Sequence, residues 1–497
     1  MAKITPKSLA QEQIEVDQAE IKKKTVSGAM SFFARTVFLN SLALITNFIL
    51  GMLLTLADFG VYGVVVQIIG ILTFFSDVGL ASALIQSKKE PTDKDYQTIF
   101  WVQMSLAVLI VIASFVIVQT GLFSEQFGEH GRYILFALSF SFLFAALRTV
   151  PSIKLTRQLN FTKLIWPPIV EQVAFNGVLI FLVVAGYGVA SYAYAIWARS
   201  LSGTAVLFLI MPYLPKLNFS WQSFKNNIKF GAKFQLNDFL ARVKDQFFFL
   251  TVSQFVNIYE FGLISFSKSW SMFPYNLTVQ NVLAITFPTF SRLQEHKDLL
   301  KRALEKSIFF ITLAIFPILM GMIMMFWPVT QVIPRYIQWE PATLTFILFT
   351  LSIAPAAIST PMTNILNATG HLNKTLKLMI MWTVLTWAIS IPLIHFRGFE
   401  GVAIGAFLVS LTSFLPIIYV KKIVDFNLFD NIWRQIVASA VMVILGLIMM
   451  QFMASGLLYF VIGGMILAMA YAITMWLVGS TKLKAEFNSL GIIKRKI

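Results

Sequence analysis

Cysteine is absent from this sequence, and charged residues are scarce. Of its 497 residues only 12% are Asp, Glu, Lys or Arg, while 57% are hydrophobic. Soluble domains carry about 25% charged residues, so the composition indicates a polytopic membrane protein. The lack of cysteine excludes disulfides, thiolate metal sites and a cysteine nucleophile.

Histidine is scarce as well. The four histidines lie in different connections between apolar runs, at His130, His296, His371 and His395. Their positions show no metal-ligand or nucleophile–base constellation. A polysaccharide polymerase or ligase needs a long catalytic loop outside the membrane, and no outer connection here exceeds about 15 residues. We therefore predict a protein that is not an enzyme and holds no cofactor.

Apolar runs dominate the rest of the chain. Residues 1–30 are polar and precede the first run, so we expect a cytoplasmic tail there and no cleavable signal peptide. About 20 apolar residues cross the ~30 Å hydrocarbon layer as a helix. Runs of that length lie near 31–55, 61–86, 98–119, 132–150, 165–185, 189–211, 228–256, 261–290, 307–327, 342–366, 375–395, 401–420, 435–453 and 457–479. The sequence thus predicts an all-α membrane protein of about fourteen transmembrane helices.

The number of lysine and arginine residues alternates between high and low from one connection to the next. They gather in the even-numbered connections, such as residues 291–306, and in the C-terminal tail, whereas the odd-numbered ones hold only Arg132, Arg335 and Arg397. By the positive-inside rule both termini are cytoplasmic, which an even number of spans requires. The same rule accounts for the net charge of +16, so we expect no nucleic-acid partner.

An internal repeat follows from the same map. Asp58-Phe59-Gly60 after the first run is matched by Glu260-Phe261-Gly262 after the seventh, an offset of 202 residues. Six spans per half is an even number, so the halves are predicted to be parallel, pseudo-symmetric six-helix lobes followed by two further helices. The predicted segments are a tail (1–30), an N-lobe (31–215), a C-lobe (216–425), two last helices (426–480) and a C-terminal tail (481–497).

One predicted span carries four charges. In the stretch 234–246, Asp238, Arg242 and Asp245 follow α-helical spacing of i, i+4 and i+7 and fall on one stripe, close enough to pair. Lys244 projects about 100° to the side, with no local acid. A structural ion-pair ladder between helices explains the first three equally well. Lys244 fits that explanation less well.

Further cations lie inside the apolar runs. The predicted lining of a central cationic cavity is Arg35, Arg199, Arg242, Lys244 and Lys268. Lys268 sits in Ser265-Phe266-Ser267-Lys268-Ser269-Trp270-Ser271, where small hydroxyl residues indicate a wet wall, although serines also allow close helix packing and a lysine can extend to the membrane surface. Arginine and lysine in a solvated cavity suit a diphosphate or an acidic sugar. Asp77, Asp238 and Asp245 are the candidates for coupling to H⁺ or Na⁺.

Several short motifs, in their order and spacing, are typical of one family. They are Asp58-Phe59-Gly60, Ser76-Asp77-Val78-Gly79-Leu80, Ala83-Leu84-Ile85-Gln86, Phe100-Trp101, residues 155–163, Phe287-Pro288-Thr289-Phe290-Ser291-Arg292-Leu293-Gln294 and Asn367-Ala368-Thr369-Gly370. Over essentially its whole length the chain resembles the polysaccharide transporter family of the MOP flippase superfamily, nearest the Wzx/WzxC type. It departs from the usual Gly-Glu-Lys-Trp-like pattern at Tyr336-Ile337-Gln338-Trp339, a difference that bears on the substrate.

The resemblance implies a function, a location and partners. It implies export of undecaprenyl-diphosphate-linked oligosaccharide of the O-antigen or exopolysaccharide type across the bacterial inner membrane, by alternating access between two lobes. The implied partners are that substrate, membrane lipids and the polysaccharide polymerase or export machinery. The alternatives are an ion-coupled small-molecule exporter of the MATE type, an uncoupled lipid scramblase and, with less support, a polymerase or ligase.

Overall fold

The computed structural model describes residues 35–36, 38–76, 84–85, 90–121, 127, 130–158, 160–225 and 241–489. In these ranges every regular element is helical. Eleven of the described helices are long and apolar enough to cross a membrane, and a shorter apolar helix covers Phe38–Leu53. The chain is therefore a multi-pass, all-helical membrane protein, as predicted.

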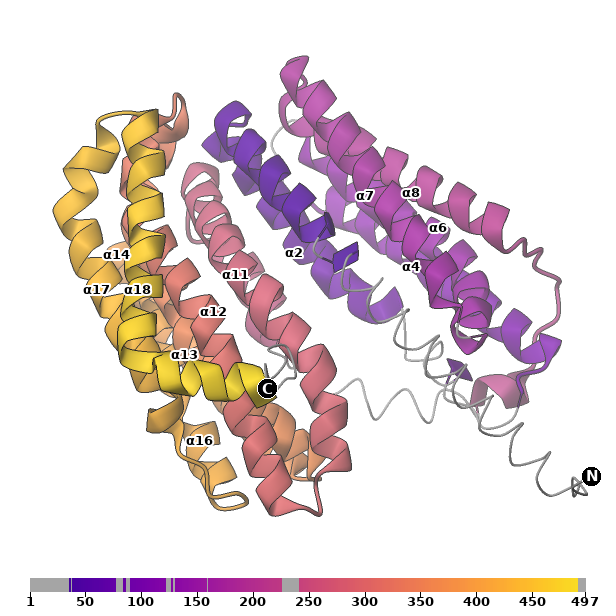
Figure 1. Ribbon diagram of the computed structural model, residues 1–497. Coiled ribbons are helices and arrows are strands. Elements are labelled where there is room, and N and C mark those ends of the chain that lie inside the picture. Colours follow the sequence, from indigo (N-terminus) through magenta and orange to yellow (C-terminus); the bar gives the residue numbers. More distant parts are fainter. Residues whose placement is uncertain are drawn as a thin grey trace, which may run out of the picture. The chain divides into compact units, whose positions relative to one another are not determined.

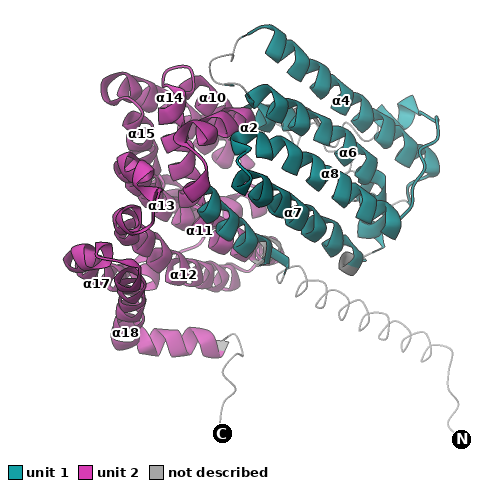
Figure 2. Cartoon of the chain, turned by 90° about the horizontal axis from the view of Figure 1, so that it is seen from above, with its two compact units in different colours: residues 1–50, 68–238 teal, residues 51–67, 239–497 magenta. Residues whose placement is uncertain are grey.

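The chain divides into two compact units, which Figure 2 colours separately. Unit 1 comprises residues 1–50 and 68–238. Its described helices include α4 (Asp93–Gln119), α6 (Gly131–Arg157), α7 (Phe161–Val184) and α8 (Ser191–Ile210), with the short η1 (Gly188–Ala190) before α8. α6 packs against both α4 and α8, and α7 packs against α8, so the four helices form a layer in the order α4, α6, α8, α7 (Figure 2).

Unit 2 comprises residues 51–67 and 239–497. Its helices are the first part of α2 (Leu56–Ser76), η2 (Val243–Phe247), α10 (Phe248–Val252), α11 (Ile258–Arg292), α12 (Lys297–Val332), η3 (Tyr336–Ala342), α13 (Thr343–Ala368), α14 (Leu372–Arg397), α15 (Glu400–Leu411), α16 (Phe414–Lys421), α17 (Leu428–Ala454) and α18 (Leu457–Ser489) (Figure 1). α13 packs on α11, α12 and α15, and the two last helices pack on α12. The division into N-lobe, C-lobe and a last helix pair at the predicted boundaries stays a prediction.

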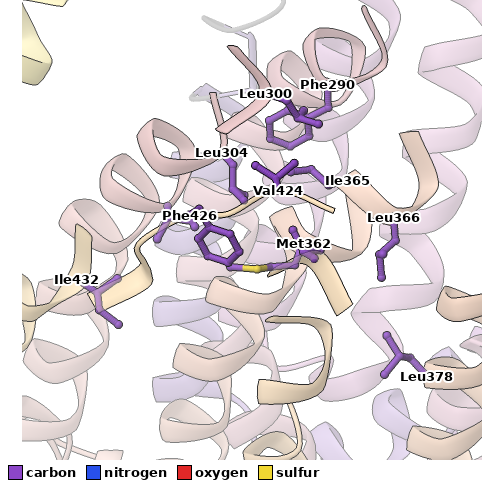
Figure 3. Packing of buried hydrophobic residues seen from close by; sticks show 12 residues of the cluster. Phe290, Leu300, Leu304, Met362, Ile365, Leu366, Leu378, Val424, Phe426 and Ile432 are labelled. Carbon is purple, nitrogen blue, oxygen red and sulfur yellow. The ribbon is translucent and has the colours of Figure 1, made fainter. Parts of the chain in front are cut away.

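A buried apolar cluster packs between the ends of several helices of unit 2 (Figure 3). Phe290 near the end of α11 packs with Leu300 and Leu304 of α12 and with Val424 and Phe426, which precede α17. Phe290 belongs to one of the motifs that carry the family resemblance. That motif residue therefore serves packing and not chemistry.

The two copies of the repeated motif begin α2 and α11 in the same way. Thr55 caps α2, because its hydroxyl accepts from the N–H of Asp58 (3.2 Å) while the Asp58 carboxylate accepts from the N–H of Thr55 (2.9 Å). Asn257 and Glu260 repeat this reciprocal capping box on α11, with hydrogen bonds of 2.9 and 3.2 Å. The acid of each motif thus satisfies the exposed N–H groups of its own helix start.

Each motif glycine faces the helix that begins with the other motif. A side chain at Gly60 would overlap the carbonyl oxygen of Ile258, and one at Gly262 would overlap the carbonyl oxygen of Leu56. The offset of 202 residues relates Leu56 to Ile258 and Gly60 to Gly262. The contact is therefore reciprocal, and only glycine allows the backbones to come so close.

Candidate functional site

A cavity of about 380 Å³ lies within unit 2, walled by η2, α10, α11, α13, α14 and α15. Three charged side chains line it: Lys244 and Asp245 from η2, and Lys268 from α11. The structure therefore brings together three of the residues that the sequence singled out. Two cations and one carboxylate give this wall an excess of one positive charge.

The three charged groups differ in their contacts. The ammonium of Lys244 lies 2.7 Å from Oδ1 of Asp245, and the two side chains are 26% and 45% exposed. The ammonium of Lys268 lies over the ring of Phe249, 3.3 Å from its centroid. A cation over an aromatic face is attracted by the ring quadrupole without being neutralised by it.

The expectation that Lys244 has no local acid is wrong, because Asp245 pairs with it directly. That expectation assumed regular α-helical steps, whereas Val243–Phe247 form a π-helix. A π-helical turn is wider than an α-helical one and changes the direction of each side chain along it. π-helical turns occur frequently at functional sites, which agrees with a cavity wall here.

Hydroxyl groups form most of the remaining polar wall. They belong to Ser271, Ser352, Ser359, Thr360, Thr363, Thr386, Ser390, Ser410 and Ser413. Most donate to a carbonyl of their own helix: Thr360 bonds Ala356 at 2.6 Å and Thr386 bonds Trp382 at 2.7 Å. A hydroxyl whose proton is used in this way presents only lone pairs to a ligand. The wall beside the two lysines therefore accepts hydrogen bonds from a ligand that carries donors.

Unit 1 holds a second group of charged side chains. Arg148 of α6 forms an ion pair with Glu171 of α7, and Nε of Arg199 of α8 lies 3.6 Å from the other carboxylate oxygen. Arg199 was predicted as a cavity cation, whereas Arg148 was missed. The sequence did contain a signal for it, because Arg148 lies within the span 132–150 and the next two spans carry Glu171 and Arg199.

The structure says less about the other predicted site residues. Arg35 lies at the start of the described part of the first helix, and Arg242 directly precedes η2. Asp77 and Asp238 lie outside the described residues, so the pairing of Asp238 with Arg242 stays a prediction. Among the described residues, no group of three or more His, Asp or Glu side chains could hold a metal ion.

The segment of η3 that departs from the family pattern, at every position except the shared Trp339, has a structural role. The indole of Trp339 stacks on Phe266, with centroids 3.8 Å apart, and donates to the carbonyl of Gly51 at 2.8 Å. The amide of Gln338 donates to the carbonyls of Gly51 and Leu54 at 3.2 and 3.1 Å. η3 thus satisfies carbonyl groups at the end of the helix Phe38–Leu53, which have no intrahelical donors.

Known proteins resemble this chain in sequence. A family model described as "Polysaccharide biosynthesis protein" matches residues 49–343. The succinoglycan biosynthesis transport protein ExoT of Rhizobium meliloti (strain 1021) is 22% identical over 282 residues, 56% of each chain. The lipopolysaccharide biosynthesis protein WzxC of Escherichia coli (strain K12) is 22% identical over 320 residues, 61% of each chain. The chain thus matches little more than half the length of these curated relatives.

Solved structures resemble it over more of its length. The lipid II flippase MurJ in an inward closed conformation superposes with a TM-score of 0.73 at 14% identity, covering 91% of this chain and 99% of that one. An inward-facing multidrug resistance MATE family transporter of the MOP superfamily gives 0.59 at 14% identity, covering 78% and 94%. These likenesses confirm the predicted fold class. By their names, these proteins are transport and biosynthesis proteins, a flippase and a transporter, which agrees with the prediction that the chain is not an enzyme.

Proposed function

Because the chain belongs to the polysaccharide biosynthesis protein family matched over residues 49–343, we propose that it is a flippase for lipid-linked oligosaccharides. In this proposal it moves undecaprenyl-diphosphate-linked repeat units of the O-antigen or exopolysaccharide type from the inner to the outer leaflet of the bacterial cytoplasmic membrane. The observation that carries the proposal is the cavity of unit 2, where Lys244, Asp245 and Lys268 adjoin a wall of hydroxyl oxygens.

The chemistry of this cavity fits a glycan that carries negative charge. A diphosphate or acidic sugar crossing a low-dielectric layer must exchange its hydration shell for fixed donors, and two ammonium groups supply them. The hydroxyl wall offers acceptors for the hydroxyl donors of neutral sugars. Tyr275 and Trp382 add flat apolar surface to the same wall, in keeping with the mixed lining of small-molecule sites.

The same features weigh against a MATE-like exporter of organic cations. Such a substrate would meet a net positive wall, and like charges within a few ångströms repel strongly at low dielectric. Transport by alternating access requires that the lysines release the anion in the outward-facing state. Asp245 can assist this release, because its carboxylate pairs with the ammonium of Lys244 and would compete with the substrate anion for it. Coupling to H⁺ or Na⁺ through Asp77, Asp238 or Asp245 belongs to the same proposal.

Export in a strain that lacks its own copy of this transporter tests the proposal. We measure which lipid-linked oligosaccharide accumulates on the cytoplasmic leaflet and which plasmid-borne variants clear it. Lys268→Ala is expected to abolish export at normal membrane abundance, whereas Lys268→Arg keeps the charge and part of the activity. Lys422→Ala, which removes an exposed lysine at the end of α16, is the control and should export normally.

Two results would contradict the proposal. A Lys268→Ala protein that is abundant in the membrane and exports at the wild-type rate leaves the cavity without a role. A Lys268→Ala protein that disappears from the membrane, together with an equally unstable Lys268→Arg protein, shows that the lysine only supports folding.

A further inference from the structure

The connection that follows α8, residues 211–225, exposes a group of large apolar side chains (Figure 1). The exposed fractions are 85% for Leu214, 90% for Leu217, 51% for Phe219 and 61% for Trp221. We call these four side chains the connection surface. The proposed function draws on the cavity of unit 2 and gives this surface no role. Apolar groups of this size, exposed close together, indicate a surface that binds a partner or a membrane.

Hydrogen bonds to the first turns of α4 hold the connection in place. The indole N–H of Trp101 donates to the carbonyl of Lys216 at 2.9 Å, and the N–H of Lys216 donates to the side-chain oxygen of Gln97 at 2.7 Å. The N–H of Ser220 and the hydroxyl of Ser223 make two more bonds to side chains of α4, at 3.0 and 2.5 Å. The backbone is therefore fixed along this stretch, and the outward direction of its apolar side chains is fixed with it.

Tyr213 anchors the start of the connection in the core of unit 1. It is buried, its ring lies 6.0 Å from that of Phe100, and the ammonium of Lys154 lies 5.3 Å from its centroid. Pro212 and Pro215 flank this part of the chain, and proline restricts the backbone to a narrow range of φ. One aromatic side chain thus packs inward against α4 and α6, while those of the connection surface stay outside.

The same connection is basic. It carries Lys216 and Lys225, both exposed, and it contains no acid. In the sequence this character continues with Lys229 and Lys233, and the next acid is Asp238. Lysine clusters beside a transmembrane helix attract the anionic lipid headgroups of the cytoplasmic leaflet. Tryptophan side chains favour the same depth, where the headgroups meet the acyl chains.

The position of the connection agrees with that depth. α8 ends at Ile210 and α4 begins at Asp93, on the side that the lysine and arginine distribution predicts to be cytoplasmic. Gln97 and Trp101, which bond the connection, lie within about 12 Å of helix from the start of α4. A lipid supplies both acyl chains for the apolar groups and phosphate for the lysines. A second copy of the chain, seated on the same surface, would instead bring like charges together.

We infer that the connection surface binds anionic phospholipids of the cytoplasmic leaflet. Its apolar side chains enter the outer part of the acyl-chain layer, and the ammonium groups of Lys216 and Lys225 bind the lipid phosphates. Because the connection is fixed to α4, bound lipid meets a surface that is already formed. The inference concerns the membrane around the protein and does not depend on which substrate the protein exports.

A single cysteine in this cysteine-free chain measures the depth of the surface. Bimane is attached to Leu217→Cys in the full-length protein, which is reconstituted in vesicles of equal parts phosphatidylglycerol and phosphatidylcholine. Lipid with a nitroxide on its acyl chain near the headgroup should quench the label, whereas acrylamide on both sides of the membrane should quench it weakly. Glu295→Cys, at an exposed position in the turn after α11, is the control and should show the reverse.

The same label measures the lipid preference. Nitroxide-labelled phosphatidylglycerol and phosphatidylcholine are compared as quenchers at the same fraction of the bilayer, and we expect phosphatidylglycerol to quench more strongly. Lys216→Gln and Lys225→Gln should each lower this preference about fivefold, because each removes one cation near the membrane surface. Lys422→Gln, at an exposed lysine after α16, is the control and should keep the preference.

Three results would overturn the inference. A Leu217→Cys label that acrylamide quenches as strongly as the Glu295→Cys label places the surface in water. Protection from acrylamide without quenching by nitroxide-labelled lipid shows that a protein partner or a second copy covers it. Equal quenching by the two lipids, or an unchanged preference in both lysine variants, removes the role of anionic headgroups. None of these results bears on export by the Lys268 variants, so the proposed function is tested separately.

Discussion

The reciprocal glycine contact between α2 and α11 makes a sharp prediction for Gly262→Ala. The new methyl group would come closer than 3.0 Å to the carbonyl oxygen and carbon of Leu56. Both atoms belong to the backbone at the start of a capped helix, so neither can turn aside as a side chain could. The substitution must therefore push the two helix starts apart.

The expected size of the effect follows from two opposing terms. Alanine in place of glycine within a helix is worth ~1 kcal/mol in favour of the folded state. Overpacking in a closely packed contact costs ~1–3 kcal/mol, and an immovable backbone neighbour places this case at the upper end. We expect a net loss of about 1–2 kcal/mol for Gly262→Ala and a similar loss for Gly60→Ala, which meets the carbonyl of Ile258.

Thermal unfolding of the purified protein in detergent measures the effect. Gly177→Ala is the matched control, because Gly177 lies inside α7 with no atom within 4 Å of an added Cβ. The control should unfold at the wild-type temperature or above it, while Gly262→Ala and Gly60→Ala unfold below it. Equal unfolding temperatures for all three variants would refute the close crossing of α2 and α11.

Three further predictions concern other parts of the chain. Gly203→Ala drives the carboxylate of Glu171 away from α8 and should lower the free energy of unfolding by ~1–3 kcal/mol relative to Gly177→Ala. An unchanged free energy of unfolding would contradict the packing of Glu171 against α8. Trp339→Phe keeps an aromatic ring but loses the indole hydrogen bond, so unfolding should become easier by ~1 kcal/mol in the same assay. Single cysteines placed at Glu125 and Lys297 in this cysteine-free chain should react with impermeant maleimide from opposite sides of the membrane, and labelling from one side would refute the predicted topology.

The helices could be predicted from the sequence because each one carries its own length of apolar residues. Their ends could not, since hydropathy detects only the part inside the lipid. α6 continues to Arg157, seven residues beyond the predicted end at 150, and α18 continues to Ser489, beyond 479. Arg148, which the sequence analysis did not single out, lies nine residues before the end of α6.

The candidate site was predictable in its residue types but not in its pairings. Lys244, Asp245 and Lys268 stood out as charges in apolar runs, and they do line one cavity. Which lysine pairs with the acid depends on a π-helical turn, and hydrophobic periodicity carries no sign of such a turn. The repeated motif, likewise, was visible as a repeat, but the sequence does not show that its two copies touch each other.

The charge arrangement of the unit 2 cavity bears on how an anion could cross the membrane. Lys244 and Lys268 share one cavity wall with the single carboxylate of Asp245, which pairs with Lys244. Two bare cations in a low-dielectric cavity would be costly when no ligand is bound, and one acid for each cation would leave no attraction for an anion. One carboxylate per cation pair limits the first cost and keeps a net positive charge.

Such a carboxylate also limits how tightly an anion binds, because it competes for the same donors at every stage of the cycle. Since a substrate bound with equal strength throughout would not be released, this competition should favour turnover at some expense of affinity. On the proposed function, Asp245→Asn should therefore bind inorganic phosphate more tightly than the wild type and yet export more slowly. A variant that binds more tightly and exports faster would show that release does not limit transport.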